Sequence, residues 1–157
     1  MNNIEQNLIK NKIKIPPAVS PIANYSPYVI TNNIIFISGQ IPISEGTILY
    51  TGKVGNDIDI ESAKKAAELC MLNSFAILKS AVNNNLLSIK KCLKITVFIN
   101  SVDTFYEQPI VANGASDLID KIMEPDAKHS RSAVSVNSLP KNAAVEIDSV
   151  FEISLEG

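Results

Sequence analysis

Hydrophobic and polar residues alternate with a helical period between Ile60 and Val82. Apolar side chains recur along one stripe of this segment, while lysines and a glutamate occupy much of the rest, so the pattern predicts an amphipathic helix. The stripe contains Ala63, Ala66, Ala67, Cys70, Met71, Phe75, Leu78 and Ala81. Asp57 or Asp59 could cap the start of this helix, and the run of asparagines at 83–85 ends it. A second helix is predicted from about Asn113 to Met123, after a break at Pro109.

Segments rich in β-branched and aromatic residues predict the strands. Residues 28–42, "YVITNNIIFISGQIP", are typical of a hairpin that turns at two asparagines. The stretch "CLKITVFIN" at 92–100 is apolar at nearly every position, which favours a central strand covered on both faces. Two further strands are predicted in "SRSAVSVN" (130–137) and "AAVEIDSVFEIS" (143–154).

The order of these elements predicts an α+β fold, in which a mixed sheet carries two main helices on one face. Residues 1–19 are expected to form a short N-terminal helix and an extended proline-rich segment, and residues 20–157 a single domain. Helices on one face leave the other face of the sheet in need of cover. An oligomer interface would provide that cover.

Alternation in the last two strands suggests where their charged residues point. If the valines meet the helices, Arg131 and Glu146 both project from the opposite face. Charges on such a face are usually solubility and pairing devices; near a buried interface they must be paired or functional. A hairpin turning at 139–142 would place Ser135 opposite Glu146, with Arg131 about 13 Å further along the strand at ~3.3 Å per residue. We therefore expect a second chain to complete any site that uses both residues.

Composition narrows the classes of function. The chain has 14 basic and 16 acidic side chains and a net charge of −2, so it lacks the basic excess that attracts nucleic acid. Its cysteines, Cys70 and Cys92, are interpreted as buried thiols, and no CxxC or histidine-rich motif indicates a zinc site. Residues 1–15 lack the apolar core of a signal peptide, and no window approaches the ~20 apolar residues of a membrane span. A cytoplasmic protein is the default expectation.

Three motifs carry a family resemblance, which covers about residues 20–155. "SGQIP" at 38–42, "TVFINSVDTF" at 96–105 and "RSAVSVNSLPKNAAVEID" at 131–148 resemble signatures of the Rid (reactive intermediate deaminase) or YjgF family. The resemblance implies a chorismate-mutase-like fold, assembled as a homotrimer with clefts between subunits. It also implies hydrolysis of enamine and imine intermediates, such as 2-aminoacrylate and 2-iminopropanoate, to 2-keto acids and ammonia. Neither a metal nor an organic cofactor is implied.

The same resemblance assigns roles to single residues. Arg131 matches the family arginine that grips the substrate carboxylate, and Glu146 matches the glutamate that positions or activates water. Substrate-binding positions are matched by Tyr25, Ser38, Asn113 and Ala133. Ala133 stands where the family often has a cysteine. His129 shares the parity of Arg131 and could touch the site, although a surface loop is the favoured interpretation.

Two other functions remain open at this point. The same cleft could bind a keto acid or amino acid without catalysis, as a binding module for small carboxylates. Ribonuclease or translation-inhibitor activity, associated with parts of the family, is disfavoured by the acidic balance, the single histidine and the absence of a basic aromatic patch.

Overall fold

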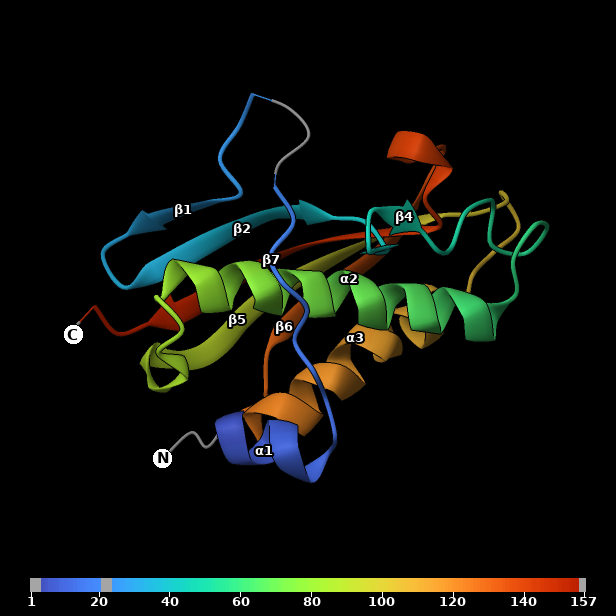
Figure 1. The fold of residues 1–157 in the computed structure, drawn as a ribbon. Helices are drawn as coiled ribbons and strands as arrows, with labels where there is room; N and C mark the ends of the chain where they lie inside the picture. The colour runs from blue at the N-terminus through green and yellow to red at the C-terminus, as the bar shows by residue number, and fades with distance from the viewer. Residues whose placement is uncertain (1–3, 21–23, 156–157) are drawn as a thin grey trace.

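The fold is a mixed sheet with helices packed on one side, seen in a computed structural model that describes residues 4–20 and 24–155 (Figure 1). The strands are β1 (Tyr28–Thr31), β2 (Ile34–Gln40), β3 (Ile43–Ser44), β4 (Thr47–Ile48), β5 (Ile89–Asn100), β6 (Ser130–Val136) and β7 (Val145–Ile153). The helices are α1 (Ile4–Lys10), α2 (Ile60–Ala81) and α3 (Gln108–Met123), with short 3-10 turns η1 (Leu86–Ser88) and η2 (Pro140–Asn142).

The main sheet has five strands in the order β1-β2-β7-β5-β6, and β3 and β4 form a separate two-stranded ribbon. Strands β5 and β6 run parallel, and the other neighbours in the main sheet run antiparallel. Helix α2 packs on β2 and β7, and α3 packs on β5 and β6. The α+β prediction, with both long helices on one face, is therefore confirmed.

Helix α2 follows the predicted pattern closely. Asp59 caps it by accepting a 2.7 Å hydrogen bond from the Ser62 amide, which satisfies one free donor of the first turn. Its apolar stripe is buried except for the partly buried Ala81, and Phe75 meets Phe151 of β7 edge to face, with ring centroids 5.5 Å apart. This contact fixes the helix above the middle of the sheet.

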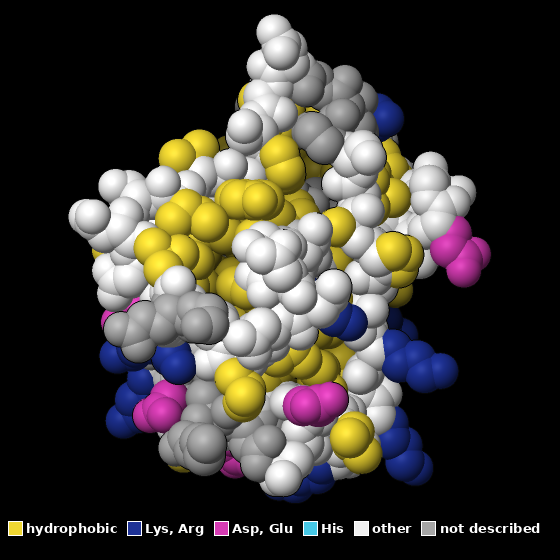
Figure 2. All heavy atoms as spheres, turned by 60° about the vertical axis from the view of Figure 1, so that its left-hand side comes forward, with side chains coloured by type: hydrophobic (Ala, Val, Ile, Leu, Met, Phe, Trp, Pro, Cys, Tyr) yellow, Lys and Arg dark blue, Asp and Glu magenta, His cyan; other side chains and the backbone are white. Residues whose placement is uncertain are grey.

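The other face of the sheet is only partly covered within one chain. Along β5, Ile95, Val97 and Ile99 are buried under the helices, whereas Thr96 and Phe98 on the opposite side are half-buried. Val29, Phe36 and Val134 belong to the same open face and are 60%, 48% and 45% exposed. Hydrophobic patches are also exposed on the side from which the β1–β2 hairpin comes forward (Figure 2). The expectation that β5 is covered on both faces is not met by a single chain.

Strands β6 and β7 do not form the predicted hairpin. β5 lies between them and pairs with both, in parallel with β6 and antiparallel with β7. Because β6 follows β5 through α3, it returns beside β5 as the second strand of a βαβ unit. The short spacing between β6 and β7 suggested adjacent strands, but their connection instead passes the end of β5.

Helix α3 begins earlier than predicted. It starts at Gln108 and includes Pro109 in its first turn, where the missing amide hydrogen costs no helical bond. The sequence pattern predicts a break at Pro109 before the helix, whereas this proline lies in the first turn of α3. The earlier start adds a full turn before Asn113.

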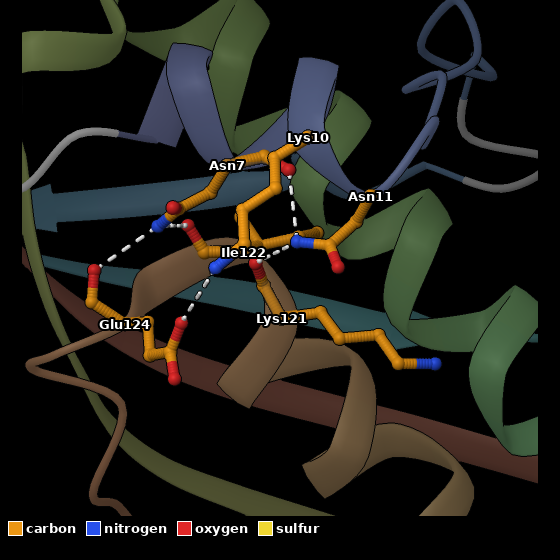
Figure 3. Close-up of polar contacts among 6 residues, drawn as sticks. All are labelled: Asn7, Lys10, Asn11, Lys121, Ile122 and Glu124. Carbon is orange, nitrogen blue, oxygen red and sulfur yellow. Dashed lines mark hydrogen bonds and ion pairs between the residues drawn. The ribbon is translucent and has the colours of Figure 1, made fainter.

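Helix α1 docks on the C-terminal end of α3 (Figure 3). The Asn7 side-chain amide donates to the carbonyls of Ile122 (3.1 Å) and Glu124 (3.0 Å), and Asn11 donates to that of Lys121 (3.0 Å). These carbonyls lie at a helix end, where intrahelical donors run out. The segment that follows α1 then passes across α2 toward the β1 side of the sheet (Figure 1).

We predict that Asn7→Ala lowers the free energy of unfolding by about 1–3 kcal/mol, because two carbonyls lose their donor in a buried contact. Lys10→Ala is the matched control on the same helix. Its ion pair with Glu124 is 3.6 Å long and both side chains are largely exposed, so we expect a loss below about 0.5 kcal/mol. Urea unfolding of the two variants checks the difference. Equal losses would show that the amide is not what docks the helix.

Candidate functional site

A β-bulge in β2 places Glu146 against the backbone of its neighbour. The register of β2 with β7 shifts between the pairs Ile37–Ser149 and Gln40–Ile147, which leaves one extra residue on β2. A Cβ at position 39 would clash with the Glu146 carboxylate oxygen Oε1. Glycine at 39 therefore lets this carboxylate lie directly against the bulged strand.

A mostly apolar pocket of about 280 Å³ opens beside Glu146. Its lining includes Val19, Tyr25, Ile43 and Ile77. One wall is held by Asn73 of α2, whose side-chain amide donates to the carbonyls of Ile41 (3.1 Å) and Ile43 (3.0 Å). The pocket thus combines a fixed apolar wall with one carboxylate, Glu146, and one lysine, Lys141.

Partial burial raises the pKa of Glu146 above the ordinary glutamate value, and the nearby negative charge of Asp148 raises it further. Among the described residues, its carboxylate forms no hydrogen bond or ion pair, although Lys141 lines the same pocket. Glu146 is therefore suited to exchange a proton with a molecule in the pocket.

Tyr25 and Ser38 contribute to this pocket in different ways. Tyr25 lines it and is 51% exposed. The Ser38 hydroxyl donates to the Ser26 carbonyl (2.8 Å), and the Ser38 amide donates to that of Pro27 (3.0 Å). In this chain Ser38 thus anchors the loop that carries Tyr25, and it does not line the pocket itself.

Arg131 lies on the helix-covered face of the sheet, so its predicted orientation is wrong. It is opposite the buried Ile95 of β5, and Ala133, two residues further along, packs against the core. On this edge strand the valines point to the open face, where Val134 is 45% exposed. Hydrophobicity therefore gave the wrong inward side for β6.

Helix α3 supplies the partners of Arg131. Arg131 Nη1 donates to Asn113 Oδ1 (2.9 Å) and to Ser116 Oγ (3.1 Å), and Arg131 Nη2 donates to the Pro109 carbonyl (3.5 Å). Asn113 and Ser116 are three residues apart and share a helix face. The Asn113 prediction thus has a direct contact with Arg131, while Ser116 was missed.

One edge of the guanidinium remains available. Nη1 makes two of these bonds and Nη2 makes one, which leaves Nε–H and one Nη2 hydrogen without a partner among the described residues. All three acceptors are neutral, and no carboxylate of the described residues pairs with Arg131. A half-buried cation with a free two-donor edge fits a carboxylate.

Close packing of α3 on α2 positions these acceptors. A Cβ at Gly114 would clash with the backbone carbonyl of Lys64 on α2. The glycine lets the helices approach at the turn that carries Asn113 and Ser116.

Arg131 and Glu146 of one chain do not meet. They are opposite Ile95 and Phe98 of β5, which places them three residues apart along the sheet and on opposite faces. With standard strand geometry the offset is about 10 Å along the strands and about 10 Å across them. The two residues do not converge within one chain, as predicted, but they lie on opposite faces of the sheet and not on one face of a hairpin.

Neither cysteine is placed for chemistry. Cys70 and Cys92 are free and buried, as predicted. Burial raises the pKa of the Cys92 thiol to about 12, and burial also raises that of Cys70.

Among residues 4–20 and 24–155, no group of three or more His, Cys, Asp or Glu side chains could hold a metal ion. No helix in these ranges has the length and apolarity to cross a membrane.

The sequence matches a protein-family model over residues 5–152, and the model is described as "YjgF/chorismate_mutase-like, putative endoribonuclease". Two similar proteins cover nearly the whole chain. Protein TCP17 from Trypanosoma cruzi is 37% identical over 152 residues, which span 96% of this chain and 94% of that protein. The crystal structure of Atu1372 from Agrobacterium tumefaciens, described as having unknown function, is 44% identical, with a TM-score of 0.89 and coverage of 96% and 92%.

Two more distant matches carry chemical information in their names. A protein from Dermatophagoides farinae called 2-iminobutanoate/2-iminopropanoate deaminase is 28% identical over 145 residues, covering 92% of this chain and 97% of that one. The structure of TdcF from E. coli with bound serine is 26% identical, with a TM-score of 0.59 and coverage of 88% and 93%.

We predict that Glu146→Gln stabilises the chain relative to the wild type as pH rises. A raised carboxyl pKa gives stability below the unfolded-state pKa, and this is lost as pH rises through the folded-state value. Glutamine does not ionise, so the variant keeps the free energy of unfolding that the wild type loses as pH rises. The difference in free energy of unfolding should reach no more than about 1 kcal/mol, since solvent screens a half-exposed group. Urea unfolding at several pH values measures it, and the advantage should shrink in an Asp148→Asn background. A difference that does not vary with pH would contradict the raised pKa.

Proposed function

Because the chain belongs to the Rid/YjgF family, we propose that it is a hydrolytic deaminase of small 2-imino acids and their enamine tautomers. The products are 2-keto acids and ammonia. The observation that carries the proposal is the Arg131 guanidinium, held by neutral acceptors along one edge and open along the other. That open edge matches the one charged group that all these substrates share, the carboxylate.

The two clusters divide the chemistry between them. Arg131 binds the carboxylate through Nε–H and Nη2–H, which fixes the imine carbon in place. Glu146 takes a proton from water as the water oxygen bonds to that carbon. The electrons of the carbon–nitrogen double bond move to the nitrogen of the protonated imine, and Glu146 then returns its proton to that nitrogen. The carbon–nitrogen bond breaks, ammonia leaves, and the hydroxyl oxygen becomes the carbonyl as its remaining proton passes to water. The apolar pocket wall accommodates the substrate side chain. The reaction requires no metal or organic cofactor.

We place the complete site between chains of a homotrimer. Arg131 and Glu146 of one chain lie on opposite faces of its sheet, so one catalytic centre needs them from different chains. The open face with Val29, Phe36 and Val134 supplies apolar surface for the contact between chains. In this arrangement Arg131 with Asn113 of one subunit faces Glu146 with Tyr25 of its neighbour.

The names of two similar proteins support the substrate class. The Dermatophagoides protein is called an imine deaminase, and TdcF holds serine, a small molecule with a carboxylate. The TdcF complex also favours a second candidate, a binding module that holds a keto acid or amino acid without turning it over. The cytoplasmic location expected from the sequence stays a prediction.

Ribonuclease activity is the third candidate function, and the description of the family model includes the words "putative endoribonuclease". The net charge of −2 offers little attraction to an RNA backbone. We therefore favour a small carboxylate as the ligand.

Mixing two inactive variants tests both the residues and the shared site. Arg131→Ala and Glu146→Gln should each lower kcat/KM for 2-iminopropanoate by about 100-fold or more, because each removes a charged group from the site. Subunits mixed one to one, unfolded and refolded together, should regain about a quarter of wild-type activity, since about one site in four then receives both intact residues. The readout is ammonia release coupled to a dehydratase.

Two controls sharpen the mixing experiment. Arg131→Lys keeps the charge without the fork and should give an intermediate activity. Each variant refolded alone should stay inactive. Full activity of Arg131→Ala would defeat the hydrolase mechanism, and inactive mixed oligomers would defeat the shared site.

The pH dependence of kcat/KM should report Glu146. Its carboxylate must be ionised to accept a proton from water, so activity should rise with pH through a pKa above the ordinary glutamate value. Asp148→Asn removes one of the two causes of the raised pKa and should move this acidic limb to lower pH. Steady-state rates across the pH range check the shift. An acidic limb that stays in place would argue against Glu146 as the base.

A further inference from the structure

A chain of hydrogen bonds continues behind Arg131, away from its open edge. Ser116 Oγ accepts from Arg131 Nη1 (3.1 Å) and lies 2.9 Å from His129 Nε2. His129 Nδ1 lies 2.8 Å from the carbonyl of Ala127. Both Ser116 and His129 are half-buried, so these contacts are partly shielded from water.

For a neutral imidazole, the chemistry of the partners gives the direction of these bonds. A carbonyl oxygen only accepts, so His129 Nδ1 must carry the hydrogen that it donates to Ala127. In the neutral imidazole Nε2 is then an acceptor, and the Ser116 hydroxyl donates to it. His129 lies in the loop before β6, as the favoured interpretation had it, but it is half-buried and its ring contacts Ser116.

This direction matters for Ser116. A serine within a helix commonly turns its hydroxyl hydrogen to the carbonyl four residues earlier. His129 draws that hydrogen away instead, so the lone pairs of Oγ face the guanidinium. A hydroxyl that donates one hydrogen bond is also polarised into a better acceptor for another.

We propose that Ser116 and His129 are a positioning pair for Arg131. They hold Nη1 against α3, so that Nε–H and the second Nη2 hydrogen stay aligned for a carboxylate. Asn113, the other Nη1 acceptor, is exposed, which leaves the half-buried Ser116 as the firmer anchor. The inference rests on the carboxylate-binding role given to Arg131 in the proposed function, and it adds two residues to that subsite.

Four variants separate positioning from packing. Ser116→Ala removes the acceptor, and His129→Phe keeps a ring of similar size without a nitrogen. His129→Gln restores an acceptor near the place of Nε2. The fourth variant combines Ser116→Ala with His129→Phe. Alanine is fully compatible with a helix, so Ser116→Ala keeps the test decisive even if the ring replacement prevents folding.

Calorimetric titration with pyruvate gives the first readout. We expect Ser116→Ala and His129→Phe each to weaken binding by about tenfold, and His129→Gln to stay within about threefold of the wild type. The double variant should bind no more weakly than Ser116→Ala, because the two residues act in series. Methyl pyruvate, which lacks the carboxylate, should show no such dependence. In turnover the same variants should raise KM and leave kcat nearly unchanged.

A second readout needs no ligand. NMR relaxation of the Arg131 Nε–H group should show an ordered side chain in the wild type and in His129→Gln, and a mobile one in Ser116→Ala and His129→Phe. The positioning pair would be overturned if the Arg131 side chain stayed ordered in both Ser116→Ala and His129→Phe. It would also be overturned if His129→Gln lowered this order as much as His129→Phe does. Because binding and order are measured without turnover, a chain that binds pyruvate but hydrolyses no imine would refute the deaminase proposal alone.

Discussion

The proposed site depends on one constraint, the hydrogen bonds that hold the Arg131 guanidinium against α3. An arginine at the edge of a sheet would ordinarily extend into water, or pair with an acid. Here three neutral oxygens of α3 hold one side of the group, and the close approach of α2 and α3 at Gly114 keeps that helix in place. A cation fixed in this way, without a protein anion beside it, stays available for an anionic ligand.

The same sheet keeps the acid away from the cation. Glu146 lies on the other face, in a pocket created by a bulge and by the absence of a side chain at Gly39. If the two groups shared one pocket in a single chain, they would pair, and the pKa of the glutamate would fall. Separation leaves Glu146 half-buried with a raised pKa, and the guanidinium edge unoccupied. In the homotrimer that we propose, the substrate lies between the two clusters.

Much of the fold could be predicted from local patterns, and the errors have physical causes. The long helix and its Asp59 cap were predictable because period and capping are local. The neighbours of β6 in the sheet were not predictable. A short connection between β6 and β7 is compatible with a hairpin, but also with a third strand, here β5, lying between the two. Val134 misled the assignment of faces because an edge strand can expose its apolar residues.

Family motifs identified Arg131 and Glu146, but they could not reveal what supports each of them. Ser116 and His129 have no motif of their own. A signal did exist, since Asn113 and Ser116 are three residues apart on one helix face and His129 shares the parity of Arg131. Recognising it required knowing that β6 runs parallel to β5 and packs against α3.

A crystal structure of the chain with bound pyruvate tests the central claim most directly. We predict the ligand carboxylate on Nε and Nη2 of Arg131, with Glu146 of an adjacent chain facing its carbonyl carbon. Pyruvate held within one chain away from Arg131, or an Arg131 side chain directed into solvent, would contradict the account.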